Sequence, residues 1–341
     1  MKALTALLLS LLSLSAGAAA ATPATRPAPA LPAALAEAPD GQWRMLKIDL
    51  LPGVGAPCCV DFKGRGADRS KACGLDDDGW NMDADRPVPP GTRLHVYLRR
   101  DRSEPAGLDR VRAFASSCAL TDEAAAVPQF TLDEAAATTL LAGLARQSPK
   151  RVGNNAIAVL ALQEGDQAGR ALEALSAAGE ADRVRRDATF WLTQTRGAQG
   201  FAAVQRLLED PQTPRNLRRH AVFALSQSAE AGRDAALMAL SRDDHDTEIR
   251  GEALFWLAQV SPDAAEPALV AAARGADFRI ADKAIFGLSQ LPSARAVPAL
   301  STLARDRGLS RKVRKQALFW LSQTDADAAM PEMDRLLGVE R

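Results

Sequence analysis

The second half of the chain repeats one short pattern at nearly constant intervals. Five segments align, VRRDATFWLTQ, LRRHAVFALSQ, IRGEALFWLAQ, IADKAIFGLSQ and VRKQALFWLSQ, which begin at residues 184, 217, 249, 280 and 313. Successive copies start 31 to 33 residues apart, and a weaker copy, VGNNAIAVLAL, begins at residue 152. Self-similarity at such a period indicates that one supersecondary unit is repeated along the chain.

Each copy carries the same apolar stripe, an aliphatic residue followed by Ala four positions later and Leu four positions after that. The stripes are Val152–Ala156–Leu160, Val184–Ala188–Leu192, Leu217–Ala221–Leu225, Ile249–Ala253–Leu257, Ile280–Ala284–Leu288 and Val313–Ala317–Leu321. This spacing places all three residues on one face of a helix. Shorter second helices are expected between the copies, for example FAAVQRLL from residue 201 and AVPALSTLA from residue 296. Because one helix pair cannot bury both apolar faces, the units must stack into an α-solenoid.

The pattern of an apolar residue, Arg, two variable residues, Ala and a later Leu resembles the HEAT-like repeats, including the short variety named from phycobilisome lyases. The resemblance covers residues 150–337. It implies an α-solenoid of about six helix–turn–helix repeats that presents a curved surface to protein partners, with the second helices on the concave face. The Arg is present as Arg185, Arg218, Arg250 and Arg314, but Gly153 and Ala281 replace it in two copies. An unbroken Arg ladder is therefore not expected.

Bulky and small residues alternate three positions after the central Ala of each copy. The series is Val159, Trp191, Ala224, Trp256, Gly287 and Trp320. Because close-packed layers interdigitate best when large side chains face small ones, we expect each Trp to occupy the space left by Ala224 or Gly287. Replacement of Trp256 by Ala is then expected to cost about 3–5 kcal/mol.

Each Trp position is preceded by an aromatic residue in five copies, and a Gln closes the same five. The Phe residues are Phe190, Phe223, Phe255, Phe286 and Phe319, and the Gln residues are Gln194, Gln227, Gln259, Gln290 and Gln323. Aromatic residues at helical spacing usually belong to a core, so a core role is expected for the Phe residues and an aromatic binding platform is the alternative. The Gln side chains are expected to hydrogen-bond to the loops between helices rather than to a ligand.

The N-terminus has the layout of a secretory signal peptide over residues 1–20. Lys2 is followed by an apolar run from Ala3 to Leu14 and by small residues that fit an A-x-A cleavage pattern. The run is shorter than the roughly 20 residues that span a bilayer. No cysteine lies near the cleavage region and no later segment is apolar enough to cross a membrane. We therefore expect a periplasmic or secreted protein with no membrane insertion and no lipid anchor.

Two further regions are expected before the repeats. Residues 21–40 are a Pro- and Ala-rich leader, which predicts a flexible or semi-extended segment. Residues 41–125 predict a small β-rich domain, because WRMLKIDL and TRLHVYLRR alternate apolar and polar residues and LDRVRAFASSC is a third, weaker strand candidate. The α-solenoid is expected over residues 130–341, with Thr131 as the cap of its first helix.

All four cysteines, Cys58, Cys59, Cys73 and Cys118, lie in the β-rich region. An even number confined to one part of an exported chain predicts two disulfides. Neighbouring cysteines rarely bridge each other, so Cys58 and Cys59 are each expected to pair with Cys73 or Cys118, in either arrangement. A zinc site is the alternative, but the C-x-x-C spacing that is typical of such sites is missing.

Signals for enzymatic chemistry are weak throughout the sequence. The three histidines, His95, His220 and His245, are scattered, and there is no nucleophile elbow, HExxH motif, phosphate-binding loop or C-x-x-C-H haem motif. Lys+Arg and Asp+Glu both number 42, so no net charge draws the chain to nucleic acid. We expect no catalytic residue, no cofactor, no metal and no nucleic-acid partner.

Three charged runs have ordinary structural explanations. The stretch LDDDGWNMDAD, with Asp76, Asp77, Asp78, Asp83 and Asp85, lacks the spacing of a calcium-binding EF-hand loop and predicts a solvated acidic loop. RDDHD at 242–246 is expected to be a solvated turn in the same way. RKVRKQ at 311–316 opens a repeat helix and is expected on its exposed face.

The sequence therefore predicts an exported interaction scaffold or adaptor that binds a protein partner on the solenoid surface. Regulation of an envelope enzyme is one form that such binding takes. The alternative is a small-molecule or chromophore-binding protein or a lyase-like enzyme, which needs a cluster of polar groups with perturbed pKa values in a concave pocket.

Overall fold

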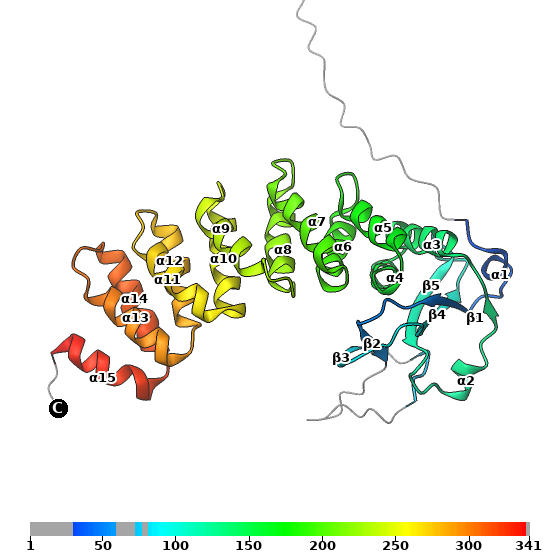
Figure 1. The fold of residues 1–341 in the computed structure, drawn as a ribbon, viewed down its shortest axis with the longest axis horizontal. Helices are drawn as coiled ribbons and strands as arrows, with labels where there is room; N and C mark the ends of the chain where they lie inside the picture. Colours follow the sequence, from blue (N-terminus) through cyan, green and yellow to red (C-terminus); the bar gives the residue numbers. More distant parts are fainter. Residues whose placement is uncertain (1–29, 59–71, 77–80, 339–341) are drawn as a thin grey trace, which may run out of the picture.

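The computed structural model describes residues 30–58, 72–76 and 81–338 of the 341-residue chain. The predicted signal peptide and Cys59 lie outside the described residues. Figure 1 shows a curved stack of helices with a smaller β-rich unit under its N-terminal end. The predicted fold class, a helical solenoid preceded by a small sheet-containing region, is confirmed.

The helices alternate between two rows. The row that carries the repeated pattern, here called the inner row, comprises α4 (Lys150–Leu162), α6 (Asp182–Thr195), α8 (Arg215–Ser226), α10 (Thr247–Val260), α12 (Phe278–Ser289) and α14 (Arg311–Gln323). The outer row comprises α3 (Glu134–Gln147), α5 (Asp166–Ser176), α7 (Gly197–Glu209), α9 (Arg233–Asp243), α11 (Pro262–Ala273) and α13 (Ser293–Arg305). A last helix, α15 (Ala326–Leu337), packs against α13 and α14.

The predicted stripes form the core of the stack. Every one of their residues is buried, and the most accessible of them, Ile280, is only 8% exposed. The central Ala of each stripe is completely buried. Its small side chain allows neighbouring helices to approach closely, as the repeat pattern predicted.

Neighbouring helices of the inner row contact one another extensively, whereas neighbouring helices of the outer row barely touch between α5 and α13. On a bent stack the inside of the bend is the more crowded side, so the inner row lies on the concave side of the arch in Figure 1. The expectation that the second helices, at 201 and 296, line the concave face is therefore wrong. Those segments belong to α7 and α13 in the outer row.

Side-chain caps mark the starts of some helices of the stack. The first helix of the stack starts at Glu134, and Asp133 rather than the expected Thr131 is its cap, because the Asp133 Oδ1 accepts a 2.7 Å hydrogen bond from the backbone N–H of Ala136. Asp246 and Ser310 cap α10 and α14 in the same way. A side-chain oxygen at this position satisfies one of the free N–H groups of the first helical turn.

The β-rich unit contains a four-stranded sheet with the order β5-β4-β1-β6. Its strands are β1 (Trp43–Asp49), β4 (Arg93–Arg100), β5 (Leu108–Ala115) and β6 (Gln129–Phe130); β6 is parallel to β1 and the other pairs are antiparallel. A second, two-stranded sheet pairs β2 (Gly55–Cys58) with β3 (Asn81–Pro87), and α2 (Asp122–Ala125) precedes β6. All three expected strands are present. In β1, Leu46 and Ile48 are buried while Lys47 and Asp49 are exposed, as the alternation predicted.

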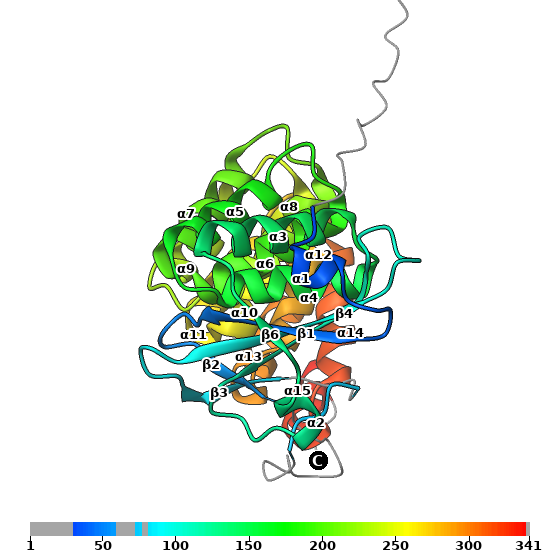
Figure 2. The ribbon, with the colours of Figure 1, turned by 90° about the vertical axis from the view of Figure 1, so that its right-hand side faces the viewer.

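The sheet and the first repeats share one continuous hydrophobic core, which runs from β1 and β4 through α4 to α6 and α7. Three hydrogen bonds reinforce this junction. The Asn155 side chain donates to the carbonyl of Val111 at 2.9 Å, the Leu51 N–H donates to Leu162, and the Glu164 N–H donates to Asp49. Figure 2 shows the strands lying directly below α4. The sheet therefore packs against α4, the first helix of the inner row.

The end of the predicted leader is part of this fold. Residues 33–36 form a short helix, α1 (Ala33–Ala36), whose Leu35 is completely buried. This helix packs against β4. The apolar side chains of Leu35 and Ala38 explain the difference from the expected flexible segment, because their burial anchors it.

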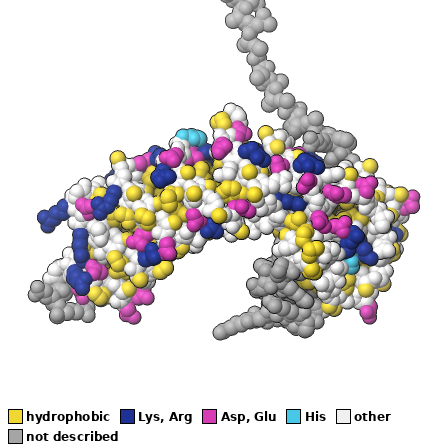
Figure 3. All heavy atoms as spheres, viewed as in Figure 1, with side chains coloured by type: hydrophobic (Ala, Val, Ile, Leu, Met, Phe, Trp, Pro, Cys, Tyr) yellow, Lys and Arg dark blue, Asp and Glu magenta, His cyan; other side chains and the backbone are white. Residues whose placement is uncertain are grey.

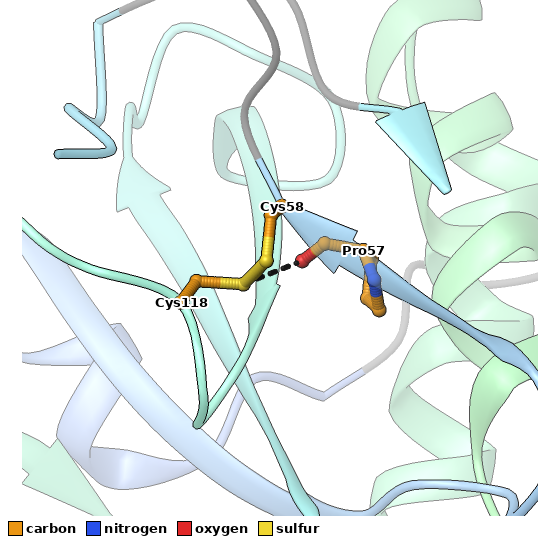
Figure 4. Close-up of a disulfide and its surroundings, with 3 residues drawn as sticks. All are labelled: Pro57, Cys58 and Cys118. Carbon is orange, nitrogen blue, oxygen red and sulfur yellow. Dashed lines mark hydrogen bonds between the residues drawn. A yellow bond between two sulfur atoms is a disulfide. The ribbon is translucent and has the colours of Figure 1, made fainter. Parts of the chain in front are cut away.

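A disulfide joins Cys58, the last residue of β2, to Cys118, which follows β5, with 5.7 Å between their Cα atoms. Figure 4 shows the bridge beside the Pro57 carbonyl oxygen, which lies 3.2 Å from the Cys118 sulfur. Cys73 is also disulfide-bonded. The bridge fastens the two-stranded sheet to the edge of the four-stranded one.

Candidate functional site

A continuous line of aromatic rings crosses the inner row from α6 to α14. We call it the aromatic ladder; in order of contact its members are Trp191, Phe190, Phe223, Trp256, Phe255, Phe286, Trp320 and Phe319. Phe190 stacks on Phe223 with ring centroids 5.9 Å apart, and Phe255 stacks on Phe286 at 6.0 Å. Each ring touches the next, so five successive helices present one connected aromatic surface.

The ladder is not part of the core. Phe190, Phe223, Phe255 and Phe286 are half-buried, and Phe319 is 50% exposed. The expectation that these Phe residues belong to the core is therefore wrong. In the view of Figure 3, hydrophobic side chains run along the helical arm as a band among charged ones. Aromatic surface left in contact with water on a regular row of helices is typical of a binding face.

At Gly287 the structure contradicts the expectation that a Trp fills the space beside the small residue, because the side chain nearest to that position is Leu269. Trp256 packs on Phe223 and Trp320 packs on Phe286, with ring centroids 4.9 and 5.0 Å apart. A Cβ added to Gly287 would instead meet the Leu269 side chain of α11 at 2.6 Å. The small residue at 287 thus accommodates the outer row, and the indoles extend the ladder.

The repeated glutamines form a second row beside the aromatic ladder, here called the glutamine row. All five, Gln194, Gln227, Gln259, Gln290 and Gln323, are exposed. Gln194 donates to the backbone carbonyl of Gln227 in the next repeat at 3.2 Å. Gln227, Gln290 and Gln323 each donate to the hydroxyl of the serine that precedes them. Among the residues that the structure describes, the expected bonding to inter-helix loops is therefore seen for Gln194 and not for the other four.

Charged side chains flank the other edge of the ladder, and over α8, α10 and α12 many of them are paired with one another. Arg219 of α8 forms an ion pair with Glu252 of α10, and Lys283 of α12 lies 3.1 Å from Glu248 of α10. Such exposed pairs contribute little to stability. Their effect here is that this stretch of the ladder has little unbalanced charge beside it.

A cleft of about 800 Å³ lies at the N-terminal end of the ladder, between the β-rich unit and the stack. The loop after β1 supplies one wall, with Pro52 and Val54. The end of α6 and the loop after α8 supply the other, with Phe190, Trp191 and Glu230. Aromatic and aliphatic walls with a few polar groups are usual for ligand-binding clefts. The β-rich unit therefore closes one end of the ladder.

Two cavities open between helices of the outer row. One, of about 440 Å³, lies between α7, α8 and α9, and another, of about 570 Å³, lies between α9, α10, α11 and α12. The first is lined by Leu208, Leu240 and the ion pair of Arg218 with Asp244. The Asp244 side chain is only 4% exposed, so the expectation of a solvated turn at 242–246 is wrong for this residue.

The remaining polar residues singled out in the sequence do not form a shared site. Asp76 lies within hydrogen-bonding distance of Arg99 and Arg110 at the edge of the sheet. RKVRKQ opens α14 with Arg311, Lys312 and Lys315 exposed, as predicted. Within residues 30–58, 72–76 and 81–338 there is no group of His, Cys, Asp and Glu that could hold a metal, and no helix long and apolar enough to cross a membrane.

Two titratable groups beside the ladder have shifted pKa values. Burial lowers the pKa of His220, whose Nε2 lies 2.8 Å from the Arg186 carbonyl oxygen and whose ring packs on Phe223. Burial raises the pKa of Asp187, which Arg183 and His220 partly oppose. Burial is the largest cause of both shifts, which therefore follow from packing between α6 and α8.

The sequence matches no protein-family model and no curated protein. Solved structures that resemble the chain include human deoxyhypusine hydroxylase (16% identity, TM-score 0.31, covering 56% of this chain and 80% of that one) and a designed armadillo repeat protein in complex with a (KR)4 peptide (18%, 0.30, 56% and 97%). An Escherichia coli protein, YibA, is similar over 60% of this chain and 82% of its own (16%, 0.34). The stacked helix pairs with their buried stripes define the fold as an α-solenoid of HEAT-like helix–turn–helix repeats.

Proposed function

We propose that this chain is an exported interaction scaffold that binds a protein partner along the inner row. The observation that carries the proposal is the aromatic ladder, which leaves half-buried and exposed rings from five successive inner-row helices on the concave side of the stack. A stack of repeats does not need these rings for its core, because the stripes already fill it. Aromatic side chains are enriched among the residues that dominate protein–protein binding energies.

The cleft beside the β-rich unit is the anchor site in this proposal. Phe190 and Trp191, the first rings of the ladder, also line this cleft. A partner bound along the ladder can therefore extend directly into the cleft. Export is supported by the layout of residues 1–20 and by the disulfide of Cys58 with Cys118, since disulfides persist mainly in oxidising compartments. In one version of this proposal, the partner is an enzyme of the cell envelope and binding regulates its activity.

Site-specific photo-crosslinking tests the proposal. A photoreactive phenylalanine analogue at Gln259, exposed on the inner row, is compared with the same analogue at Ala235, exposed on α9 of the outer row. Cells expressing each full-length chain are irradiated, and crosslinked proteins are identified by mass spectrometry. One discrete protein adduct from position 259 and none from position 235 is the expected result. Equal crosslinking from both positions, or from 235 alone, contradicts it.

A further inference from the structure

We propose that the last inner-row helix, α14, binds an acidic helix of the partner on the face formed by Arg311, Lys315 and Phe319, here called the terminal face. This inference rests on the proposed function and specifies the chemistry of the partner at the C-terminal end of the aromatic ladder. It follows from the way in which each inner-row helix holds the next one, because that arrangement shows which groups such a face contacts.

From α6 to α14, neighbouring helices of the inner row meet through equivalent positions. The residue two places before the first stripe residue of one helix contacts the cap or the first turn of the next inner-row helix. The four contacts are Asp182 with Asn216, Arg215 with Asp246, Thr247 with Arg279 and Phe278 with Lys312. Each contact joins complementary groups, a hydrogen-bond donor with an acceptor or a cation with an aromatic face. The residue at this position therefore indicates the chemistry of the helix that packs beside it.

The contact of α8 with α10 involves the same residue types as the terminal face. Along one side of α8, two basic residues and a phenylalanine follow one another at four-residue intervals, and they meet two carboxylates and an indole of α10. Arg215 Nε lies 2.5 Å from Asp246 Oδ2, Arg219 Nε lies 2.9 Å from Glu252 Oε1, and the ring centroids of Phe223 and Trp256 are 4.9 Å apart. This side of α8 therefore holds an acidic helix.

The terminal face carries these side chains at the equivalent positions of α14, with Lys315 in place of an arginine. Within the residues that the structure describes, no inner-row helix follows α14, and neither Arg311 nor Lys315 has an ion-pair partner. Phe319 is 50% exposed, whereas Phe223 is half-buried beside Trp256. The side that α8 uses to hold α10 is therefore open to solvent on α14.

The charge of the terminal face favours an acidic ligand. Arg311 and Lys315 are both basic, and the exposed Lys312 lies between them in the sequence. In Figure 3, Lys and Arg side chains project from the C-terminal end of the helical arm. Glu332 of α15 pairs with Arg305 of α13 rather than with α14. Carboxylates of a ligand helix therefore gain ion pairs on this face, whereas basic side chains are repelled.

The spacing of the ligand groups follows from α10. Its second carboxylate, at 252, lies six positions after the first, at 246, and its indole lies four positions after the second. Asp246 also caps α10, so a ligand helix of this kind begins directly after its first acidic residue. A second copy of the chain does not offer such a helix from its N-terminal end, because the sheet packs against α4 there. We therefore expect the acidic helix to belong to another protein.

Titration of a labelled synthetic peptide with the purified full-length chain tests this inference. The probe has the sequence of residues 246–260, DTEIRGEALFWLAQV, with blocked ends, and the comparison peptide differs only by Glu252→Lys. Fluorescence anisotropy follows binding. We expect the unmodified peptide to bind at least about fivefold more tightly, because one attractive pair becomes a repulsive one, and added salt should reduce this difference. Equal binding of the two peptides overturns the inference.

Variants of the protein locate the binding face. Lys315→Glu should weaken binding of the unmodified peptide about fivefold and should prefer the Glu252→Lys peptide, because the charges are then exchanged. Arg311→Glu combined with Lys315→Glu should weaken binding of the unmodified peptide about tenfold or more. Arg170→Glu combined with Arg242→Glu is the control, since both residues are exposed on outer-row helices and the change of formal charge is the same. Circular dichroism confirms that each variant is folded. Equal losses in the two double variants contradict the inference.

Two other occupants of the terminal face are outcomes of the same set of variants. Binding of phosphatidylglycerol vesicles that is lost in Arg311→Glu with Lys315→Glu, without binding of the acidic peptide, would assign the face to lipid headgroups. Self-association of the wild type that is lost in this double variant would assign it to a second copy, and sedimentation velocity detects it. Either result overturns the inference.

The inference and the proposed function fail in different ways. If the two peptides bind equally while position 259 still crosslinks to a protein, the scaffold function stands and the acidic helix is wrong. If the acidic peptide binds selectively while position 259 crosslinks to nothing, the terminal face binds as inferred and the partner does not lie along the inner row. If position 259 crosslinks to nothing and neither peptide binds, both fail together.

Discussion

Arg218 on α8 and Asp244, directly after α9, form an ion pair with 2.5 Å between Nη2 and Oδ2, and the two side chains are only 6% and 4% exposed. The pair fastens the inner-row helix α8 to the turn between α9 and α10. It also lines the cavity of about 440 Å³ between α7, α8 and α9. A charge in such a position is tolerated only while its partner is present.

Removal of one partner should therefore be costly. Asp244→Ala leaves the Arg218 guanidinium buried without its counter-charge, and we expect the free energy of unfolding to fall by about 3–5 kcal/mol. The double variant Arg218→Met with Asp244→Leu should recover most of this loss. Urea denaturation measures both. For comparison, Arg206→Ala removes an exposed pair with Glu173 and should cost less than about 1 kcal/mol. Similar losses of unfolding free energy for Asp244→Ala and Arg206→Ala would contradict the prediction that the buried Arg218–Asp244 pair matters more than an exposed pair.

A second prediction concerns the junction of α6 and α7. A Cβ on Gly200 would lie 1.9 Å from the backbone carbonyl oxygen of Leu192, which cannot move without breaking α6. We expect Gly200→Ala to lower the free energy of unfolding by about 3 kcal/mol, because the two helices must separate. Gly232→Ala is the control, since its Cβ meets only the ring of Phe201, at 3.3 Å. An unchanged thermal midpoint for Gly200→Ala would show that α6 and α7 are farther apart than in the structure.

The stripe and the ladder should respond differently to truncation. Leu257 is completely buried, so Leu257→Ala should cost about 2–5 kcal/mol. Phe319→Ala removes a ring that is 50% exposed and should cost about 1 kcal/mol or less. Trp256→Ala, on a half-buried indole, should cost about 2 kcal/mol, below the range for a core Trp. Chemical denaturation of the three variants in one buffer tests this order, and a Phe319→Ala loss as large as that of Leu257→Ala would place the ladder in the core.

Stability should also depend on pH through His220. Because burial lowers its pKa below the ordinary value of 6.5, the unfolded chain takes up this proton more readily than the folded one. Stability is therefore lost as pH falls below 6.5. Asp187 acts in the opposite sense at more acidic pH, because its raised pKa lets the folded state hold a proton that the unfolded state releases.

Comparison of the wild type with His220→Gln isolates the histidine, since Asp187 is present in both. The loss of unfolding free energy between pH 7.5 and pH 5.5 should be smaller in the variant. Urea denaturation at the two pH values gives both differences. An equal loss in the two proteins would mean that His220 is protonated equally well in the folded and the unfolded chain.

The solenoid could be predicted from the sequence because its signal is repeated. An apolar residue, Ala and Leu at four-residue intervals define one helix face, and the six copies support each other. All the stripe residues are buried. The strands around Leu46 and Leu94 were predictable for a related reason, since a two-residue alternation needs only local sequence.

An exposed aromatic surface was considered only as the alternative to a core role, although the sequence contained a signal for it. At about 100° per residue, a Phe two positions after the central Ala lies about 200° from it, on the opposite face of the helix. The Gln six positions after the Ala lies about 240° from it, next to the Phe. The general tendency of aromatic residues to be buried was given more weight than this angle. The pairing of Arg218 with Asp244 was not predictable, because it joins residues 26 positions apart that only the packing of α8 against the turn after α9 brings together.

The junction of the β-rich unit with α4 determines how the molecule should come apart. At the N-terminal end the first repeat is covered by strands that share its core and are tied down by a disulfide. At the other end, α15 presents Met330 to solvent beside α14. In a stack where each unit is held only by its neighbours, opening begins at the less protected terminus. Backbone amides should therefore exchange with deuterium fastest near α15 and progressively more slowly toward α4.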